Sequence, residues 1–183
     1  EYRMLTLTFT LDSHMQIKEL EETIYIGVPK QNVMNEKSYE AKYECQNRDM
    51  IQAFEEIYTK QLIDLSDVEL VILHGYFLAG AAIYIAKKLK KALIYYLHVQ
   101  YAGKLYDNDT ISRDEYGILG HARAVVAVSE YVLKEANKIF PVLNKSRIIA
   151  KGIEFSYIDS ISEVKRDEEL FLYVGRLSEE KGI

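Results

Sequence analysis

Short runs of purely apolar residues alternate with helix-like segments from about residue 47 onward. The three clearest runs are Leu70–Leu73, Ala92–Leu97 and Ala124–Val128. A strand that is apolar at every position is typical of a parallel sheet whose two faces are covered by helices. The connections between such strands are right-handed crossovers. The sequence therefore predicts an α/β fold with a Rossmann-like, doubly wound and mostly parallel sheet.

Further secondary structure is predicted on both sides of these runs. Strands are expected over residues 4–10 and 23–28, joined by a polar stretch at 12–22, and over 147–150 and 170–174. Apolar side chains recur at helical spacing over 47–64 and 77–89, which predicts two amphipathic helices. Two more helices are predicted to begin at Ser112, which has capping-box spacing to Glu115, and at Ser129.

Composition excludes several classes of protein. Of the 183 residues, 49% are hydrophobic, which is ordinary for a globular protein and too many for a disordered one. The single cysteine, Cys45, excludes an intramolecular disulfide and a cysteine-cluster zinc site. One cysteine also fits a reducing compartment, so we expect a cytoplasmic protein. The net charge of −5 argues against nucleic acid as a partner, and no apolar run approaches the roughly 20 residues of a membrane-spanning helix.

A cluster of lysines ends the predicted helix 77–89. Its members are Lys87, Lys88, Lys90 and Lys91. Cations suit a helix C-terminus because they complement its partial negative charge. The cluster is therefore interpreted as a solvated helix end, and an anion-binding patch is the alternative.

Polar residues or glycines follow the predicted strands, at the positions where open α/β sheets bind ligands. They are His74-Gly75, His98, Ser129, Lys151-Gly152 and Gly175-Arg176. His98 has two interpretations: a core histidine bonded to the backbone, or a hydrogen-bond partner for a ligand in the crevice. His74 has the same two. No two of the four histidines have the spacing of a metal site.

The end of the chain, YVGRLSEEKGI, offers a candidate anion site. Arg176 follows a predicted strand, and Lys181 lies five residues later, across a helix start at Ser178. A guanidinium, an ammonium and free helix N–H groups could together hold a diphosphate, although Glu-Glu-Lys in a first turn is also ordinary solvated surface. The glycine-rich loops GxGxxG and GxxxxGK[ST], which usually cradle phosphates, are absent.

These landmarks resemble a known family when they are taken in order. Tyr173–Ile183 resembles the motif that opens the second domain of family 4 retaining glycosyltransferases, which have the GT-B fold and belong to the glycogen and starch synthase-like superfamily. Four upstream segments also resemble landmarks of this family: Val68–Ala79, Ile94–His98, Ala122–Glu130 and Ile148–Glu154. The resemblance covers roughly residues 66–183.

The resemblance implies a parent enzyme that transfers a sugar, with retention, from a nucleotide-diphosphate sugar to an unknown acceptor. The donor is a substrate, and no cofactor or metal ion is implied. His98 matches the family's active-site histidine. The implied donor-diphosphate residues are Arg176, Lys181 and Gly175, and the implied substrate contacts are His74, Ser129, Gly152 and Glu154.

The chain also departs from the family pattern. It has no Gly-Gly pair to form the loop that closes over the donor phosphate, and the acidic pair of the second domain would lie beyond Ile183. Lys151 stands where the family usually has Asn, and Glu154 where it has Asp. We therefore expect a domain trimmed at both ends, inactive alone. Residues 1–168 are expected to form the Rossmann-like, acceptor-side N-terminal domain, and 169–183 the first strand and motif of the C-terminal donor-binding domain.

Other functions stay open at this point. A non-catalytic sugar- or nucleotide-binding or regulatory module could be built on the same fold. A sugar-nucleotide epimerase of the GT-B type is disfavoured by the tail motif. Self-association through the apolar residues 170–174 and a weak membrane association of the parent protein are also left open.

Overall fold

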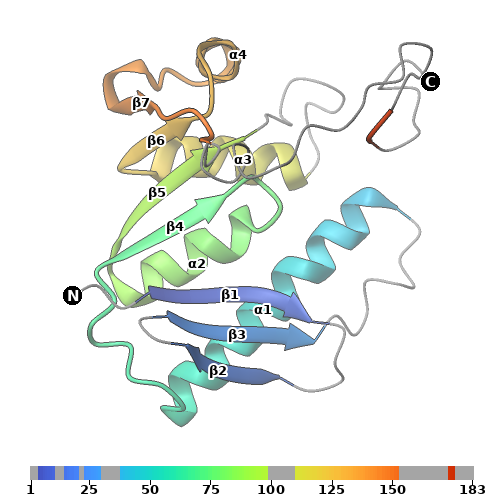
Figure 1. The fold of residues 1–183 in the computed structure, drawn as a ribbon, viewed down its shortest axis with the longest axis vertical. Coiled ribbons are helices and arrows are strands. Elements are labelled where there is room, and N and C mark those ends of the chain that lie inside the picture. Colours follow the sequence, from blue (N-terminus) through green and yellow to red (C-terminus); the bar gives the residue numbers. More distant parts are fainter. Residues whose placement is uncertain are drawn as a thin grey trace, which may run out of the picture. The chain divides into compact units, whose positions relative to one another are not determined.

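The computed structural model describes residues 4–10, 15–20, 23–29, 38–98, 110–152 and 173–175. The chain separates into two units, Glu1–Lys151 and Gly152–Ile183. All helices and strands assigned in the described residues belong to the first unit, drawn as a ribbon in Figure 1. The domain boundary expected after residue 168 lies outside the described residues and stays a prediction.

A four-stranded parallel sheet forms the centre of the first unit. Its strands are β4 (Leu70–His74), β5 (Ala92–Leu97), β6 (Ala124–Ala127) and β7 (Ser146–Ile148). They lie side by side in the order β4-β5-β6-β7, and each neighbouring pair is parallel. This confirms the predicted α/β, Rossmann-like arrangement.

Three helices connect these strands. They are α2 (Ala79–Leu89), α3 (Thr110–His121) and α4 (Glu130–Ile139), and a short 3₁₀ turn, Leu143–Lys145, precedes β7. Ser129 caps α4 as predicted, because its side chain accepts a hydrogen bond from Val132 N–H at 3.3 Å. The capping box predicted at Ser112 is wrong, because α3 begins earlier, at Thr110, and the carboxylate of Glu115 lies in the core.

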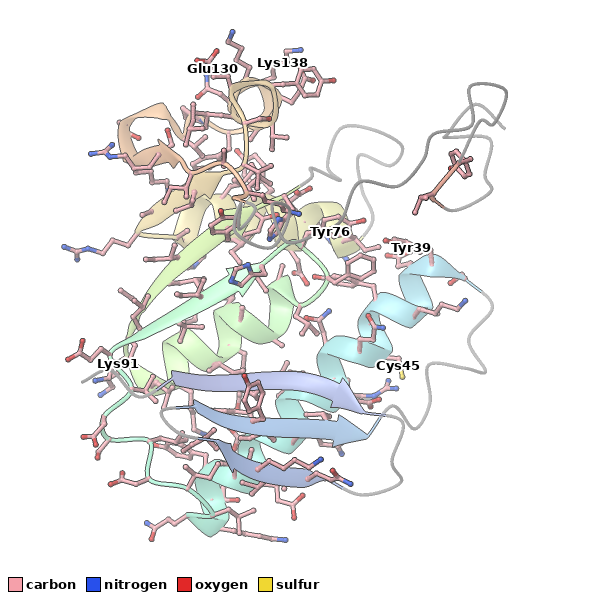
Figure 2. The ribbon with its side chains drawn as sticks, in the orientation of Figure 1. Tyr39, Cys45, Tyr76, Lys91, Glu130 and Lys138 are labelled. Atoms are coloured by element: carbon pink, nitrogen blue, oxygen red, sulfur yellow. The ribbon has the colours of Figure 1, made fainter. Side chains whose placement is uncertain are left out.

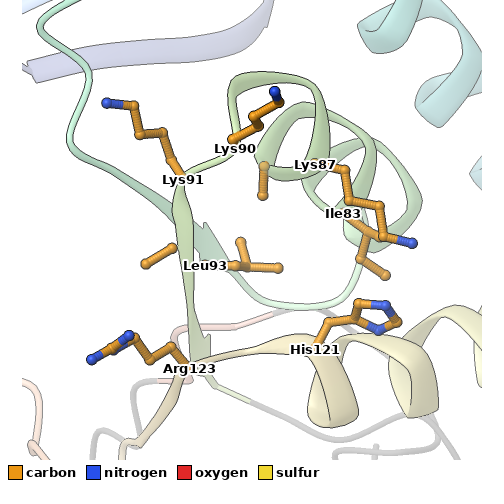
Figure 3. Close-up of a pocket in the computed structure, with 9 residues that line it drawn as sticks. Ile83, Lys87, Lys90, Lys91, Leu93, His121 and Arg123 are labelled. Atoms are coloured by element: carbon orange, nitrogen blue, oxygen red, sulfur yellow. The ribbon is translucent and has the colours of Figure 1, made fainter.

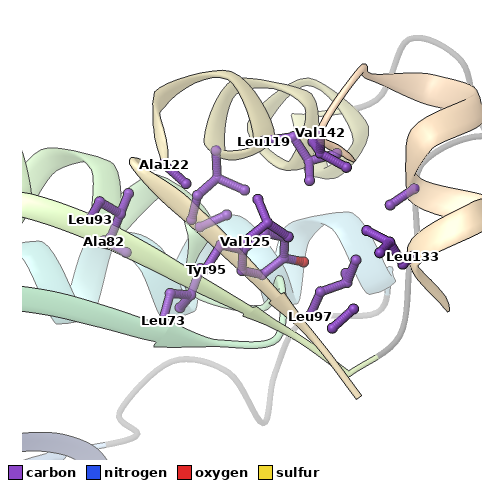
Figure 4. Close-up of a cluster of buried hydrophobic side chains, with 14 of the residues drawn as sticks. Leu73, Ala82, Leu93, Tyr95, Leu97, Leu119, Ala122, Val125, Leu133 and Val142 are labelled. Atoms are coloured by element: carbon purple, nitrogen blue, oxygen red, sulfur yellow. The ribbon is translucent and has the colours of Figure 1, made fainter. Parts of the chain in front are cut away.

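The main core lies between the sheet and these helices (Figure 4). Tyr95, Leu97 and Val125 from the strands meet Ile118 and Leu119 from α3, and all five are fully buried. Each such apolar side chain contributes roughly 1.5–3 kcal/mol through burial. The phenol of Tyr95 donates a hydrogen bond to Glu115 Oε1 at 3.2 Å, and burial raises its pKa, so it stays a neutral donor.

Burial on both faces of the sheet is only partly confirmed. Alternate residues of β5 are buried, whereas Ile94 and Tyr96 are half-buried. In β4 only Leu73 is fully buried, and Ile72 is 51% exposed. The continuous apolar runs therefore predicted the strands correctly but overestimated the burial of one face.

A second, three-stranded sheet lies at the start of the chain. It contains β1 (Met4–Thr10), β2 (Gln16–Leu20) and β3 (Thr23–Pro29) in the order β1-β3-β2. β1 and β3 are parallel, and β2 pairs with β3 in the antiparallel sense. The polar stretch 12–22 thus contains a strand that the sequence did not predict. In β2, Ile17 is 40% exposed, which is typical of a sheet face that is open to solvent.

The long helix α1 (Tyr39–Lys60) joins the two sheets into one unit. It packs Met50 and Ile57 against Ile24 and Ile26 of β3, and it also contacts α2 and α3. The helix begins at Tyr39 rather than at residue 47, because Ser38 caps it by accepting a hydrogen bond from Ala41 N–H at 3.0 Å.

Candidate functional site

The carboxyl ends of the parallel strands bring several predicted site residues to one edge of the sheet. His74 ends β4 and is in register with Tyr96 of β5, and His98 directly follows β5. Ser129 lies two residues after β6. The first unit ends at Lys151, three residues after β7. The structure therefore confirms that His74 and His98 lie at strand ends, and it shows that the two strands are neighbours.

Three aromatic rings at this edge, those of His74, Tyr96 and His98, form what we call the ring triad. His74 Nδ1 and His98 Nε2 lie 3.2 Å apart and share one hydrogen bond. The ring centroid of Tyr96 lies 5.0 Å from that of His74 and 4.9 Å from that of His98. The phenol of Tyr96 donates to the carbonyl of Ile149 at 2.9 Å, so the triad is attached to the segment that follows β7.

Strand geometry explains where the triad lies. Side chains alternate across a strand, so Tyr96 and His98 point away from the face on which Tyr95 and Leu97 are buried. Tyr96 and His98 are half-buried. His98 is therefore not a core histidine under the helices, and its ring lies on the more open face of the sheet.

Electrostatics favour the neutral form of His98. Burial, the nearby charge of Lys151 and the neighbouring His74 together lower the pKa of His98 below its ordinary value. Its Nδ1 atom is buried and has no hydrogen-bond partner among the described groups. A neutral imidazole can both donate and accept a hydrogen bond, whereas an imidazolium can only donate.

Gly75 gives the edge beside the triad an open space. Its backbone lies in the left-handed region, with φ of 73°, and its N–H donates to Tyr96 O at 2.9 Å. A Cβ built at Gly75 would meet no atom within 4 Å, so the backbone conformation alone restrains this position. Gly152, in the second unit, also has open space around its Cα.

The other predicted site residues are placed less fully. Ser129 acts as the cap of α4, which is a structural role, and its predicted contact with substrate stays a prediction. Glu154, Arg176 and Lys181 lie outside the described residues. Gly175 is described, and a Cβ there would lie 2.7 Å from the phenol oxygen of Tyr173.

The predicted strand 170–174 is wrong where the structure describes it. Tyr173 and Val174 are in no strand, and they are 45% and 86% exposed. Residues 170–172 lie outside the described part of the chain. An apolar sequence therefore did not suffice to form a strand at its last two residues.

Two contributors to the site were missed in the sequence. Tyr96 was not singled out, although a ring two residues before His98 must lie on the same face of the strand. Lys151 was placed after a strand, but its charge effect on His98 depends on three-dimensional distance.

Cys45 is buried at 1% exposure on α1, where Figure 2 labels it. Burial raises the pKa of its thiol, which disfavours the nucleophilic thiolate. Among the residues that the structure describes, no cluster of His, Cys, Asp and Glu could hold a metal ion, and no helix there is long and apolar enough to span a membrane.

Comparison with known proteins agrees with this geometry. The model of the family described as Glycosyltransferase Family 4 matches residues 43–157, well over half of the chain. The chain belongs to Glycosyltransferase Family 4. The matched range contains β4 to β7 and the ring triad, so the Rossmann-like part of the first unit is the family 4 domain, of the GT-B N-terminal type.

A solved structure supports the fold of this family 4 domain. It is described as "Trehalose-6-phosphate from E. coli bound with UDP-2-fluoro glucose" and matches with a TM-score of 0.58. The match covers 84% of this chain at 9% sequence identity, so it concerns the fold alone. This chain spans only 43% of the length of that solved chain. No curated protein matches the family 4 chain in sequence.

Proposed function

We propose that this family 4 chain is the acceptor-side domain of a retaining glycosyltransferase whose donor is a nucleotide-diphosphate sugar. Family membership supports glycosyl transfer. The solved relative is described as bound with UDP-2-fluoro glucose, which supports a nucleotide-sugar donor. Because the chain spans 43% of that relative, we assign most donor contacts to a second domain of a longer parent protein.

The observation that carries this proposal is the bonded pair of His74 and His98 at the carboxyl edge of the sheet. In our proposal the neutral His98 exchanges hydrogen bonds with a hydroxyl of the donor sugar and so orients the anomeric carbon. His74 holds the ring of His98 in place through the 3.2 Å hydrogen bond. Orienting a reactant in this way lowers the entropic part of the barrier.

The transfer itself breaks the bond between the anomeric carbon and a diphosphate oxygen and forms a bond to the oxygen of an acceptor hydroxyl, whose proton passes to the leaving diphosphate. Negative charge then builds up on the leaving nucleotide diphosphate. We propose that Arg176, Lys181 and the backbone of Gly175 offset this charge, as their sequence pattern suggests. Ser129, Gly152 and Glu154 are proposed substrate contacts, and the proposed reaction uses no cofactor or metal ion. A cytoplasmic location is proposed from the single cysteine.

The test of catalysis uses the parent protein with its donor-binding domain. His98→Ala is expected to lower turnover by about 10–1,000-fold, because the sugar loses an orienting contact. His74→Gln is expected to lower turnover less and to shift its pH profile, because it acts only through His98. Tyr131→Phe, at an exposed ring on α4, serves as the matched control and should keep wild-type turnover. Turnover of His98→Ala within about twofold of the wild type would contradict the proposal.

A second test concerns the chain alone. Without a donor-binding domain, it is expected to bind nucleotide sugars only at about millimolar concentration or more weakly, and to transfer none. Isothermal titration with a panel of nucleotide sugars measures this. A micromolar dissociation constant without transfer would instead favour a non-catalytic binding module.

A further inference from the structure

The two ends of β5 have different surroundings. At its start lies a pocket of about 420 Å³ that several basic side chains line (Figure 3). Lys91 and Arg123 point to one side of the strand there, and Lys87 and His121 point to the other, so their charges do not meet at one point. The lysine cluster is therefore better interpreted as a solvated helix end than as an anion-binding patch. At the carboxyl end of β5, by contrast, hydrogen bonds and ring contacts join the side chains.

The phenol of Tyr96 makes a bond that spans a whole strand. Tyr96 of β5 is in register with Val126 of β6, and Val126 is in register with Arg147 of β7. The hydroxyl of Tyr96 donates to the carbonyl of Ile149, two residues beyond Arg147, at 2.9 Å. Neighbouring strands lie about 4.7–4.9 Å apart. The bond therefore crosses β6 and joins β5 directly to the chain that leaves β7.

Ile149 is held at both of its backbone groups. Its N–H donates to the carbonyl of Ala127 at 2.9 Å, and its own carbonyl accepts the bond from Tyr96. Within the described part of the chain, no hydrogen bond holds residues 150–152. The bond from Tyr96 is therefore one of the last two hydrogen bonds before Lys151, where the first unit ends.

Lys151 lies only two residues beyond this bond. A chain spans at most about 3.3–3.6 Å per residue, so the Cα atom of Lys151 stays within about 7 Å of that of Ile149. From there the positive charge of Lys151 acts on His98 and disfavours the imidazolium. Lys151 is exposed, and among the described residues no carboxylate pairs with it. The position of its backbone therefore decides how close its charge comes to His98.

The other titratable groups around His98 are few in the described part of the chain. The rings of His74 and Tyr96 contact His98, and His74 lowers the pKa of His98 in the same sense as Lys151 does. No carboxylate among the described residues raises that pKa. Arg147 of β7 donates to the carbonyl of the residue before it at 2.8 Å. Lys151 is thus the described cation that acts on His98.

We propose that Tyr96 is a positioning residue of the candidate site, which holds Lys151 near His98 through its hydrogen bond to Ile149. Tyr96 then supports His98 in two ways, with its ring against the imidazole and with its hydroxyl on the chain that carries Lys151. The proposal deepens the proposed function and rests on it only where turnover is concerned. Removing the hydroxyl while keeping the ring separates the two contributions.

The experiment compares Tyr96→Phe with the wild-type chain by imidazole NMR titration, with the signal of His98 assigned from its loss in His98→Gln. Without the bond, the chain from Ile149 to Lys151 is held less closely, so the pKa of His98 should rise toward its ordinary value. Added salt should raise this pKa in the wild type, because it screens the exposed charge of Lys151, and should have a smaller effect in Tyr96→Phe. Tyr131→Phe removes the hydroxyl of an exposed ring on α4 and should leave the pKa unchanged.

A double-variant cycle tests whether Tyr96 acts through Lys151. Lys151→Gln alone should raise the pKa of His98, and adding Tyr96→Phe to it should cause no further rise, because the charge is already gone. An unchanged pKa in Tyr96→Phe would overturn the proposal. Equal rises from Tyr96→Phe in the presence and in the absence of Lys151 would overturn it as well, because Tyr96 would then act by keeping water away from His98.

Turnover of the parent protein separates this proposal from the proposed function. If neutral His98 orients the sugar, Tyr96→Phe should move the acidic limb of the pH profile of turnover to higher pH, because His98 becomes protonated earlier as the pH falls. A raised pKa of His98 with an unmoved profile would support the positioning role of Tyr96 and contradict the role of His98 in transfer. An unchanged pKa of His98 overturns the positioning role whatever the profile shows.

Discussion

His74 Nδ1 lies 3.2 Å from His98 Nε2, so the last side chain of β4 and the first side chain after β5 share one hydrogen bond. The bond requires that one of the two nitrogens carry a proton and the other a lone pair. Full protonation of both rings would therefore remove it and place two positive charges side by side. Burial and the charge of Lys151 lower the pKa of His98, which disfavours such a doubly charged pair.

Replacing Lys151 should raise the pKa of His98. Burial is the largest cause of the lowered pKa, and the positive charge of Lys151 is the next. Lys151→Gln removes that charge and leaves the burial unchanged, so the pKa should move back toward its ordinary value without reaching it. Imidazole NMR titration measures the change. Lys134→Gln, on the exposed face of α4, should leave the pKa of His98 where it is, and an equal shift in both variants would contradict the assigned cause.

The lowered pKa of His98 predicts how the free energy of unfolding depends on pH. The pKa of His98 is lower in the folded state, so the unfolded chain takes up a proton first as the pH falls. As the pH falls below about 6.5, the free energy of unfolding should therefore decrease. Below the folded-state pKa of His98, this residue should cause no further decrease. His98→Gln should show a smaller decrease over this window. Urea unfolding of both proteins from pH 8 to pH 5 tests this, and identical slopes would refute it.

Much of the main sheet could be predicted from the sequence because its strands carry continuous apolar runs. β5 has the predicted bounds, Ala92–Leu97, since Lys91 and His98 end the run on either side. The placement of His74 and His98 at strand ends followed from the same runs. Their contact could not be predicted, because it needs β4 and β5 to be neighbours and strand order leaves no local signal.

The remaining differences between the predicted and the observed secondary structure arise where side chains contact residues that are far away in the sequence or are exposed at a sheet edge. β2 lies at the edge of its sheet, and its exposed Ile17 and Lys18 give no apolar run to recognise. The first turns of α1 bury Tyr43 and Asn47, a polar pair whose partners come from other segments. The apolar residues at helical spacing therefore begin only at about residue 47, whereas α1 begins at Tyr39.

Asn47 should be one of the main polar supports of the first unit. It is buried on α1, and its Oδ1 accepts a hydrogen bond from Ala81 N–H at 2.8 Å, in the first turn of α2. Its Nδ2 donates to Phe77 O at 2.9 Å. The residue that precedes α2, Leu78, has no capping side chain, so Asn47 supplies the cap from another helix.

Asn47→Ala should therefore lower the free energy of unfolding by about 2–4 kcal/mol, because buried backbone groups lose their partners. Asn47→Asp should cost at least as much, because a buried carboxylate oxygen would then face the Phe77 carbonyl to which Nδ2 donates. Asn144→Ala, at an exposed position, is the control and should cost under about 0.5 kcal/mol. Urea unfolding provides the values, and a loss below about 1 kcal/mol for Asn47→Ala would show that the cap is dispensable.

Lys145 should stabilise the end of α3 through its ammonium group. Nζ donates to the carbonyls of Leu119, Gly120 and Ala122 at 2.6, 3.2 and 2.9 Å. Partial burial lowers its pKa, because the ammonium group loses part of its hydration there. Lys145→Met keeps the length of the apolar stem but removes all three bonds, so the free energy of unfolding should fall by about 1.5–3 kcal/mol.

The matched control for Lys145→Met is Lys134→Met, which removes an exposed lysine whose Nζ lies 3.8 Å from Glu130. Exposed pairs of this kind contribute little, so this variant should stay within about 0.5 kcal/mol of the wild type. Hydrogen exchange adds a local readout, because loss of the carbonyl partners should increase exchange of amides in the last turn of α3. Equal stability of the two variants, with unchanged exchange in α3, would mean that water replaces the ammonium group at no cost.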